Sequence, residues 1–259
     1  MTTIQTEGRR HSAAAIIVAG SLITSIMLGA RSTFGIYLSP VVDALDTDRG
    51  TFALAIAIQN LIWGLTQPFF GAVADRYGSA RVLMAGAVGY AASLLLMASA
   101  DSTGLLILST GFLVGVSTGA ASFAVVLSAV GRLVAPERRS LALGIVTAMG
   151  SVGQFVLVPI AQELVAAYGW RQTVSYLAVI VLVVLAITRP LRGNADAQLA
   201  RTAAAAATDG GPPPTPEPEG YTLREDLRRA AAHRPYLLLN LAFFVCGFHV
   251  TFIATHLPS

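Results

Sequence analysis

Lysine is absent from this chain of 259 residues, in which all seventeen permanently basic side chains are arginines. A retinal protein holds its chromophore as a Schiff base on a lysine amine, so that class is excluded. The one cysteine, Cys246, lies inside an apolar run, which excludes a disulfide framework and a cysteine metal cluster. The sequence also offers no nucleophile and base pair, zinc-helix pattern or phosphate loop, so we expect neither an enzyme nor a metal or cofactor.

Charged residues are scarce as well. They make up 12% of the chain, against 54% hydrophobic residues and a mean hydropathy of +0.67, whereas a soluble domain carries about 25% charged residues. Apolar runs of 18 or more residues recur along the chain, each long enough to cross a hydrocarbon core of about 30 Å as a helix. The runs lack the alternation of a transmembrane barrel, and the first is too long for a signal peptide. The sequence therefore predicts an all-α membrane protein.

Seven spans are expected, at about 13–39, 51–74, 82–100, 104–131, 140–166, 171–190 and 236–257. With a cytoplasmic amino terminus, fourteen arginines lie on the inner side, and only Arg49 and Arg171 lie outside. This asymmetry follows the positive-inside rule and predicts a multi-pass protein of the cytoplasmic (inner) cell membrane. The net charge of +3 comes from arginines that lie mostly on one side of the membrane, so no nucleic-acid partner is needed to explain it. The lipid bilayer is the expected partner.

The composition changes after the sixth span. We expect a cytoplasmic tail at 1–12, a six-helix half at 13–190, a linker at 191–234 and a seventh helix at 235–259. The linker contains "RTAAAAATDGGPPPTPEPEG", which predicts disorder, and then "YTLREDLRRAAAHRP", which predicts a short amphipathic helix on lipid phosphates or in solvent. Six spans, a linker and one more span have the layout of half a transporter plus the beginning of its second half, so we expect a fragment or a truncated product.

The segment "GAVADRYGSAR" at 71–81 lies in the predicted inner loop between spans two and three. Through Gly71, Asp75, Arg76, Gly78 and Arg81 it resembles the signature of the major facilitator superfamily, with Ala80 in place of a frequent basic residue. The resemblance implies a bundle of two six-helix halves, which this loop latches together when the cytoplasmic side is closed. An ordinary basic loop is the alternative. Independently of the family, Gly71 permits close helix approach and Gly78 permits a turn conformation that other residues disfavour.

Other segments resemble the same superfamily. "APERRSLALGI" at 135–145 resembles its loop between spans four and five, which implies a gating role for Arg139. The segments "RSTFGIYLSPVVDAL" and "FVCGFHVTFIATHLP" resemble the bacterial branch related to monocarboxylate and oxalate/formate carriers. In span four, Gly111, Gly115 and Gly119 recur at every fourth position and predict a smooth face for helix contact.

Arg31 is the only charged residue between Ala13 and Val42, about 27 Å along the first helix. It either snorkels outward or faces a central cavity, where its guanidinium would bind a substrate carboxylate. On span two, Asn60, Trp63 and Gln67 share one face at 100° per residue. Gln154 belongs to a similar polar stripe on span five. These stripes serve either substrate contact or helix packing.

Span seven carries His249 and His256, whose spacing is wrong for metal ligands on adjacent turns. His249 either carries a coupling proton or forms a hydrogen bond between helices. The candidate substrate-binding residues are thus Arg31, Asn60, Trp63, Gln67, Gln154 and His249. The leading hypothesis is a secondary transporter that takes up or exchanges small organic anions such as monocarboxylates, coupled to protons, by alternating access. The alternative is a truncated, non-transporting membrane protein that acts as a sensor or assembly partner.

Overall fold

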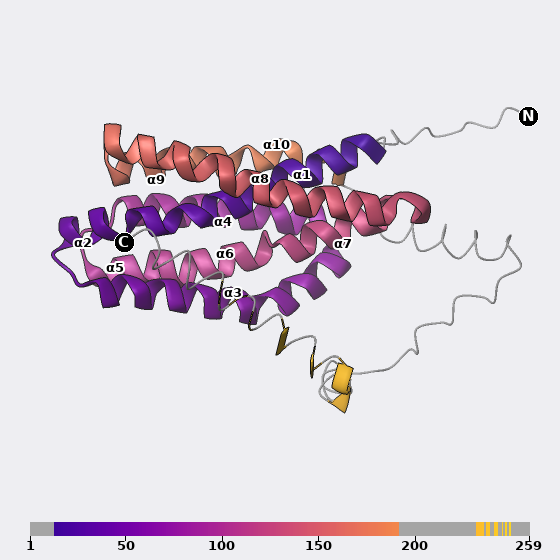
Figure 1. The fold of residues 1–259 in the computed structure, drawn as a ribbon, viewed down its shortest axis with the longest axis horizontal. Coiled ribbons are helices and arrows are strands. Elements are labelled where there is room, and N and C mark those ends of the chain that lie inside the picture. Colours follow the sequence, from indigo (N-terminus) through magenta and orange to yellow (C-terminus); the bar gives the residue numbers. More distant parts are fainter. Residues whose placement is uncertain are drawn as a thin grey trace, which may run out of the picture. The chain divides into compact units, whose positions relative to one another are not determined.

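The computed structural model describes residues 13–191 and isolated positions between 232 and 249. Its contacts divide the chain into two units, Met1–Ala195 and Asp196–Ser259. All the continuous helices of the described part belong to the first unit and form an elongated helical bundle (Figure 1). The predicted tail, the linker and most of the predicted seventh span lie outside the described residues.

Six segments of the described part are long and apolar enough to cross a membrane, and each coincides with one of the first six predicted spans. In chain order they comprise α1 (Ala13–Ser32), η1 (Thr33–Tyr37) and α2 (Leu38–Leu45); α3 (Arg49–Tyr77); α4 (Ser79–Ala98); α5 (Thr103–Leu106), η2 (Ile107–Leu113), α6 (Val114–Ala120) and α7 (Phe123–Leu133); α8 (Pro136–Tyr168); and α9 (Trp170–Leu182) with α10 (Val184–Ile187). A final turn, η3 (Arg189–Leu191), follows the sixth span.

Spans one and four are each built from several helical pieces. In span one a 3₁₀ turn joins α1 to α2, and Pro40 then falls in the first turn of α2, where no backbone N–H is needed. The first span therefore continues to Leu45, beyond the predicted end near residue 39. Span four changes from a π-helical stretch to α6 and breaks at Ala121, after which the Ser122 side chain accepts a hydrogen bond from the Val125 amide and caps α7.

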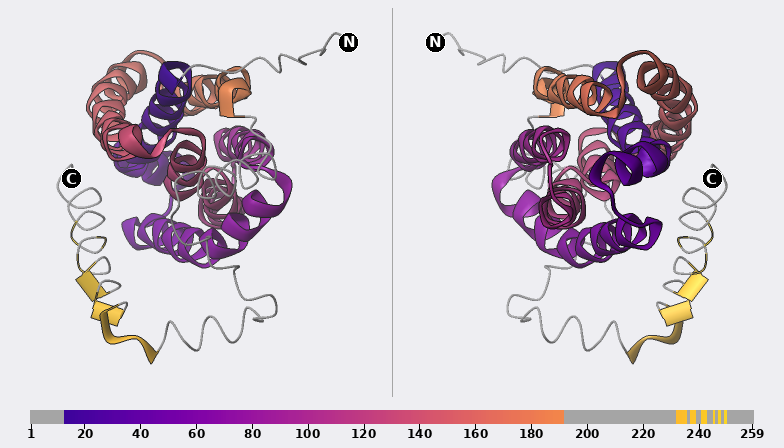
Figure 2. Two further views of the ribbon diagram at one scale, coloured as in Figure 1. Left: turned by 90° about the vertical axis from the view of Figure 1, so that its right-hand side faces the viewer. Right: turned by 90° about the vertical axis from the view of Figure 1, so that its left-hand side faces the viewer.

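The bundle is assembled from close helix pairs, in which α1 packs on α8, α3 on η2 and α6, and α4 on α9. The end-on views of Figure 2 show α1 beside α8 and, across the bundle, α3. Glycines allow these approaches: a Cβ on Gly153 would lie 2.1 Å from the Ser25 carbonyl oxygen, and one on Gly119 would lie 2.1 Å from Thr66 Oγ1. Gly111 and Gly115 face backbone oxygens of α3 in the same way, which confirms the predicted smooth face of span four.

The helices differ in how much apolar surface they leave uncovered. Span four is the most buried, whereas α3 and α8 are the least buried spans of the described part. Large apolar side chains such as Leu65 and Phe155 are exposed on these two helices, Phe155 with 83% of its surface. In a membrane protein such apolar surface contacts lipid or other helices. We therefore expect α3 and α8 to contact lipid or further helices.

The end of the bundle opposite the first residue of α1 is tied together by Arg171. Its guanidinium donates hydrogen bonds to the carbonyl oxygens of Ala98 and Ala100 and to Asp101 Oδ1, each at 2.9 Å, and stacks on Trp170 with 4.8 Å to the ring centroid. The first two bonds satisfy carbonyl groups that the end of α4 leaves without helical partners. One arginine at the start of α9 thus fixes the connection between spans three and four.

Candidate functional site

Arg31 forms two contacts with α3. Its Nη2 donates a hydrogen bond to Asn60 Oδ1, and its guanidinium carbon lies 4.3 Å from the centroid of the Trp63 ring. Asn60 and Trp63 are three residues apart on α3, so they present neighbouring side chains to the same partner. The structure therefore brings together three of the six predicted substrate-binding residues. In this bundle the Arg31 side chain is directed at another helix, α3.

The Asn60 amide has a defined orientation. Its Nδ2 donates a hydrogen bond of 2.8 Å to the Ile56 carbonyl oxygen, one turn earlier in α3. With the amide nitrogen engaged in this way, the oxygen is left for Arg31. The contact between spans one and two thus joins a cation to a neutral acceptor.

The charge of Arg31 has no carboxylate partner in the described part of the chain. The two ion pairs found there, Arg132 with Asp75 and Arg171 with Asp101, lie at the ends of the spans. Asp101 and Asp75 are exposed, and Asp75 lies in the last turn of α3. A positive charge without an acid nearby, inside a helical bundle, is expensive and marks a functional site in membrane proteins.

Tyr90 is a neighbour of Arg31 that the sequence did not reveal. It lies on α4, near Arg31, and is fully buried. Its hydroxyl, the Tyr37 hydroxyl and Trp63 Nε1 are buried without a hydrogen-bond partner among the described residues. Tyr90 stands in an apolar run in which Ser93 is the one polar neighbour at helical spacing, so the sequence pattern did not single it out.

Two further predicted substrate-binding residues, Gln67 and Gln154, do not join this group in the described structure. Gln67 lies on α3 one turn beyond Trp63, Gln154 lies on α8, and neither forms a hydrogen bond with Arg31. His249 belongs to the second unit, where its Nδ1 lies 2.9 Å from the Val245 carbonyl oxygen. Within the described residues no group of three His, Cys, Asp or Glu side chains is placed to hold a metal ion.

The predicted signature residues surround Gly78, the single residue between α3 and α4: Gly71, Asp75 and Arg76 belong to α3, and Arg81 belongs to α4. Gly78 ends α3 and precedes α4 with a φ of 93°, a conformation that side chains disfavour, so the expected role of this glycine is confirmed. Asp75 forms an ion pair with Arg132 Nη1, and Arg132 Nη2 donates a hydrogen bond of 2.6 Å to Ser79 Oγ. Arg132, at the end of α7, thus ties span four to the connection between α3 and α4.

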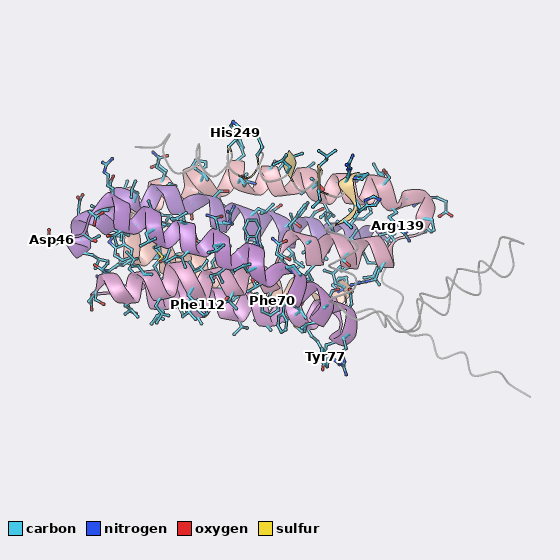
Figure 3. The ribbon with its side chains drawn as sticks, turned by 90° about the horizontal axis from the view of Figure 1, so that it is seen from below. Asp46, Phe70, Tyr77, Phe112, Arg139 and His249 are labelled. Atoms are coloured by element: carbon cyan, nitrogen blue, oxygen red, sulfur yellow. The ribbon has the colours of Figure 1, made fainter. Side chains whose placement is uncertain are left out.

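The other signature residues are exposed at the same end of the bundle. Arg76 lies over the Tyr77 ring at 5.6 Å, and Arg81 Nη1 donates to the Tyr77 carbonyl oxygen at 3.4 Å. Arg139 on α8 is also exposed; Figure 3 shows Tyr77 and Arg139 toward one end and Asp46 at the other. No described atom lies within 4 Å of the place that a Cβ on Gly71 would occupy, so the close approach expected there does not occur among the described helices.

The fold and these contacts define a class: a polytopic α-helical bundle with an intramembrane cation and a charged, glycine-capped loop between spans two and three. A family model described as Major Facilitator Superfamily matches residues 20–259. The chain belongs to this superfamily of transporters.

Relatives and a solved structure agree with this assignment. The chain is 27% identical over 184 residues to Monocarboxylate transporter 13 of Rattus norvegicus, covering 70% of this chain and 42% of the relative. It is 23% identical over 214 residues to the uncharacterized MFS-type transporter YhjX of Escherichia coli, covering 83% and 50%. A crystal structure of the peptide transporter POT in complex with sulfate superposes with a TM-score of 0.58 at 19% identity, over 97% of this chain and 48% of that one. The chain thus spans about half the length of these proteins.

Proposed function

We propose that the protein containing this chain is a secondary transporter that carries small organic anions such as monocarboxylates, together with protons, across the cytoplasmic membrane. Two six-helix halves would rock about a site near the bilayer midplane, as in other alternating-access carriers. The chain described here supplies the first half. Arg31 would bind the substrate carboxylate, with Asn60 and Trp63 beside it.

The observation that carries this proposal is the contact of Arg31 with two uncharged side chains on another helix. A guanidinium presents paired N–H groups in the geometry that a carboxylate accepts. Asn60 engages Nη2, and Trp63 covers one face, so further N–H groups at the edge of the guanidinium stay available for an anion. The name of the relative from Rattus norvegicus supports a monocarboxylate as the first substrate to test.

The coupling proton is assigned to His249 within this proposal, because an imidazole is the side chain that titrates near neutral pH. Gln67 and Gln154 remain proposed contacts to the polar part of the substrate. For the loop, we propose that Gly71, Asp75, Arg76, Gly78 and Arg81, together with Arg139, take part in closing the cytoplasmic side.

The test is uptake of radiolabelled monocarboxylates into vesicles that contain the protein expressed from its native gene. Arg31→Gln should abolish uptake while the amount of protein in the membrane is unchanged. Arg49→Gln is the matched control, because Arg49 is an exposed arginine at the first position of α3, outside the site. Undiminished uptake by Arg31→Gln would refute the role of Arg31. A pH-sensitive dye inside the vesicles tests the proton, whose entry should accompany wild-type uptake and disappear in His249→Gln.

A further inference from the structure

We propose that Asn60 is a positioning residue that aims the Arg31 guanidinium while leaving its positive charge uncompensated, so that the site selects anions. This inference rests on the proposed function, because it assigns to Asn60 the reason why Arg31 prefers an anion. Asn60 therefore has two tasks: to hold a flexible side chain in one place, and to do so without contributing charge.

The hydrogen bonds of the Asn60 amide explain how it holds the Arg31 guanidinium in place. Asn60 Nδ2 is fixed by the Ile56 carbonyl oxygen at 2.8 Å, so Oδ1 is presented on the side where Arg31 Nη2 donates to it. Arginine has several rotatable bonds and loses much rotamer freedom when it is ordered. The α3 backbone fixes the orientation of Asn60, and Asn60 in turn holds the guanidinium in place before the substrate binds. Substrate binding therefore costs less side-chain entropy of Arg31.

The need for an uncharged side chain at position 60 follows from a comparison of the Asn60 amide with a carboxylate. A carboxylate has the same shape as the Asn60 amide and would accept the same hydrogen bond, but it would also pair with Arg31 as a counter-ion. Inside a helical bundle the attraction between two such charges is strong, so an incoming anion would have to displace it. With an amide, the charge of Arg31 is left for the substrate to neutralise.

The other groups around Arg31 are uncharged as well. Trp63 of α3 stacks on the guanidinium, the buried Tyr90 of α4 lies near it, and the buried Tyr37 of η1 lies near Tyr90. None of these side chains is a carboxylate. Among the described residues, Asn60 is the one that accepts a hydrogen bond from the Arg31 side chain, so a negative charge at position 60 would lie directly against the guanidinium.

The experiment compares Asn60→Asp with Asn60→Ala in the protein expressed from its native gene, using uptake of a radiolabelled monocarboxylate. Asn60→Ala removes the positioning bond but keeps the charge available, so KM should rise by a few-fold with kcat little changed. Asn60→Asp keeps an acceptor but neutralises Arg31, and its KM should rise by roughly tenfold or more, as expected for competition with a close charge pair. Gln162→Glu, which adds a carboxylate at an exposed position of α8, should leave KM unchanged.

Which of the two variants has the higher KM decides whether Asn60 positions Arg31 and keeps its charge available or has a purely structural role. If Asn60 only filled space and bonded Arg31, the isosteric Asn60→Asp would be the milder change. A KM for Asn60→Asp at or below that of Asn60→Ala overturns the proposal.

A second measurement separates this inference from the proposed function and does not depend on transport. In a background in which Trp170 and every further tryptophan of the expressed protein are replaced by phenylalanine, the emission of Trp63 reports the stacked cation. Asn60→Ala and Arg31→Gln should shift this emission in the same direction, whereas Gln162→Glu should not. If the emission shifts but the wild type takes up no monocarboxylate, the substrate assignment fails and the positioning stands. If the emission does not shift in Asn60→Ala, the positioning role fails whatever the substrate is.

Discussion

The Arg31 guanidinium carbon lies 4.3 Å from the centroid of the Trp63 ring, which places a cation of span one over an aromatic face of span two. The negative face of an indole attracts a cation, and the attraction grows when water is excluded. The same ring shields one side of the guanidinium, so an anion has to approach from its edge. The relationship therefore links the packing of two helices to the direction from which a substrate can reach the charge.

Replacing Trp63 tests this stacking. A cation–π contact is worth about 0.5–2 kcal/mol, so Trp63→Ala should raise the KM for a monocarboxylate by roughly 2- to 30-fold, and Trp63→Phe by less. The measurement is the concentration dependence of uptake. Trp170→Ala is the matched control, because Trp170 also stacks on an arginine, Arg171, but at the start of span six, away from Arg31. It should lower the melting temperature of the purified protein and leave KM unchanged; equal effects of Trp63→Ala and Trp170→Ala on KM would contradict the site.

Two glycines of α8 give a test of the helix packing. A Cβ on Gly153 would overlap the Ser25 backbone of α1, whereas nothing in the described structure lies within 4 Å of a Cβ on Gly144. Gly153→Ala should destabilise the bundle by about 1–3 kcal/mol, the range for overpacking. Gly144→Ala should stabilise it by roughly 0.5–1 kcal/mol, because alanine loses less entropy in a helix. Thermal unfolding in detergent would show opposite shifts, and a stabilising Gly153→Ala would mean that α1 and α8 are not in close contact.

The ion pair between Asp75 and Arg132 is expected to affect the transport cycle more than folding. Both side chains are partly exposed, 63% and 36%, and exposed pairs contribute only about 0–1 kcal/mol to stability. We expect Asp75→Asn and Arg132→Gln each to lower the maximal uptake rate several-fold with little change in melting temperature. The exchange Asp75→Arg with Arg132→Asp should recover part of the rate. A double exchange as slow as the single variants would show that the residues act separately.

Asp48 provides a pH-dependent element outside the spans. Its side chain caps α3 by accepting hydrogen bonds from the Thr51 amide at 2.9 Å and the Thr51 hydroxyl at 2.6 Å, and these bonds lower the pKa of the Asp48 carboxyl. A lowered pKa means that the stabilisation is present above the ordinary aspartate range and is lost as the pH falls through the lowered value. Asp48→Ala should lower the melting temperature at neutral pH, and the difference should shrink in strongly acid buffer. Asp46→Ala, nearby in the same loop, is the control; a pH-independent difference would exclude the cap.

Much of the fold could be predicted from the sequence because a bilayer imposes a simple length and polarity requirement. Each of the first six apolar runs coincides with a membrane-length segment. The glycine repeat of span four could be assigned to a helix contact, since small residues at every fourth position leave one face flat. Span one continues past its predicted end near residue 39, because a 3₁₀ turn joins α1 to α2, and residue types alone did not predict that turn.

The site could be predicted only in part. Helical periodicity grouped Asn60 with Trp63, and in the structure both side chains contact Arg31. Gln67 shares that face, but a further turn of α3 moves it about 6 Å along the axis, which is enough to separate it from the guanidinium. Tyr90 and Arg132 were missed as partners, because their contacts cross between helices that are distant in sequence.

By itself the sequence determined that this is a helical membrane protein with a superfamily signature loop and a single cation in its first span, because these properties depend on residue types and short spacings. Only the tertiary structure decided which side chains meet. Asn60 reaches Arg31 across 29 positions and Arg132 reaches Asp75 across 57, and both contacts depend on how the helices pack. Helix packing follows from glycines and side-chain shapes acting together over the whole bundle, and no local pattern contains that information.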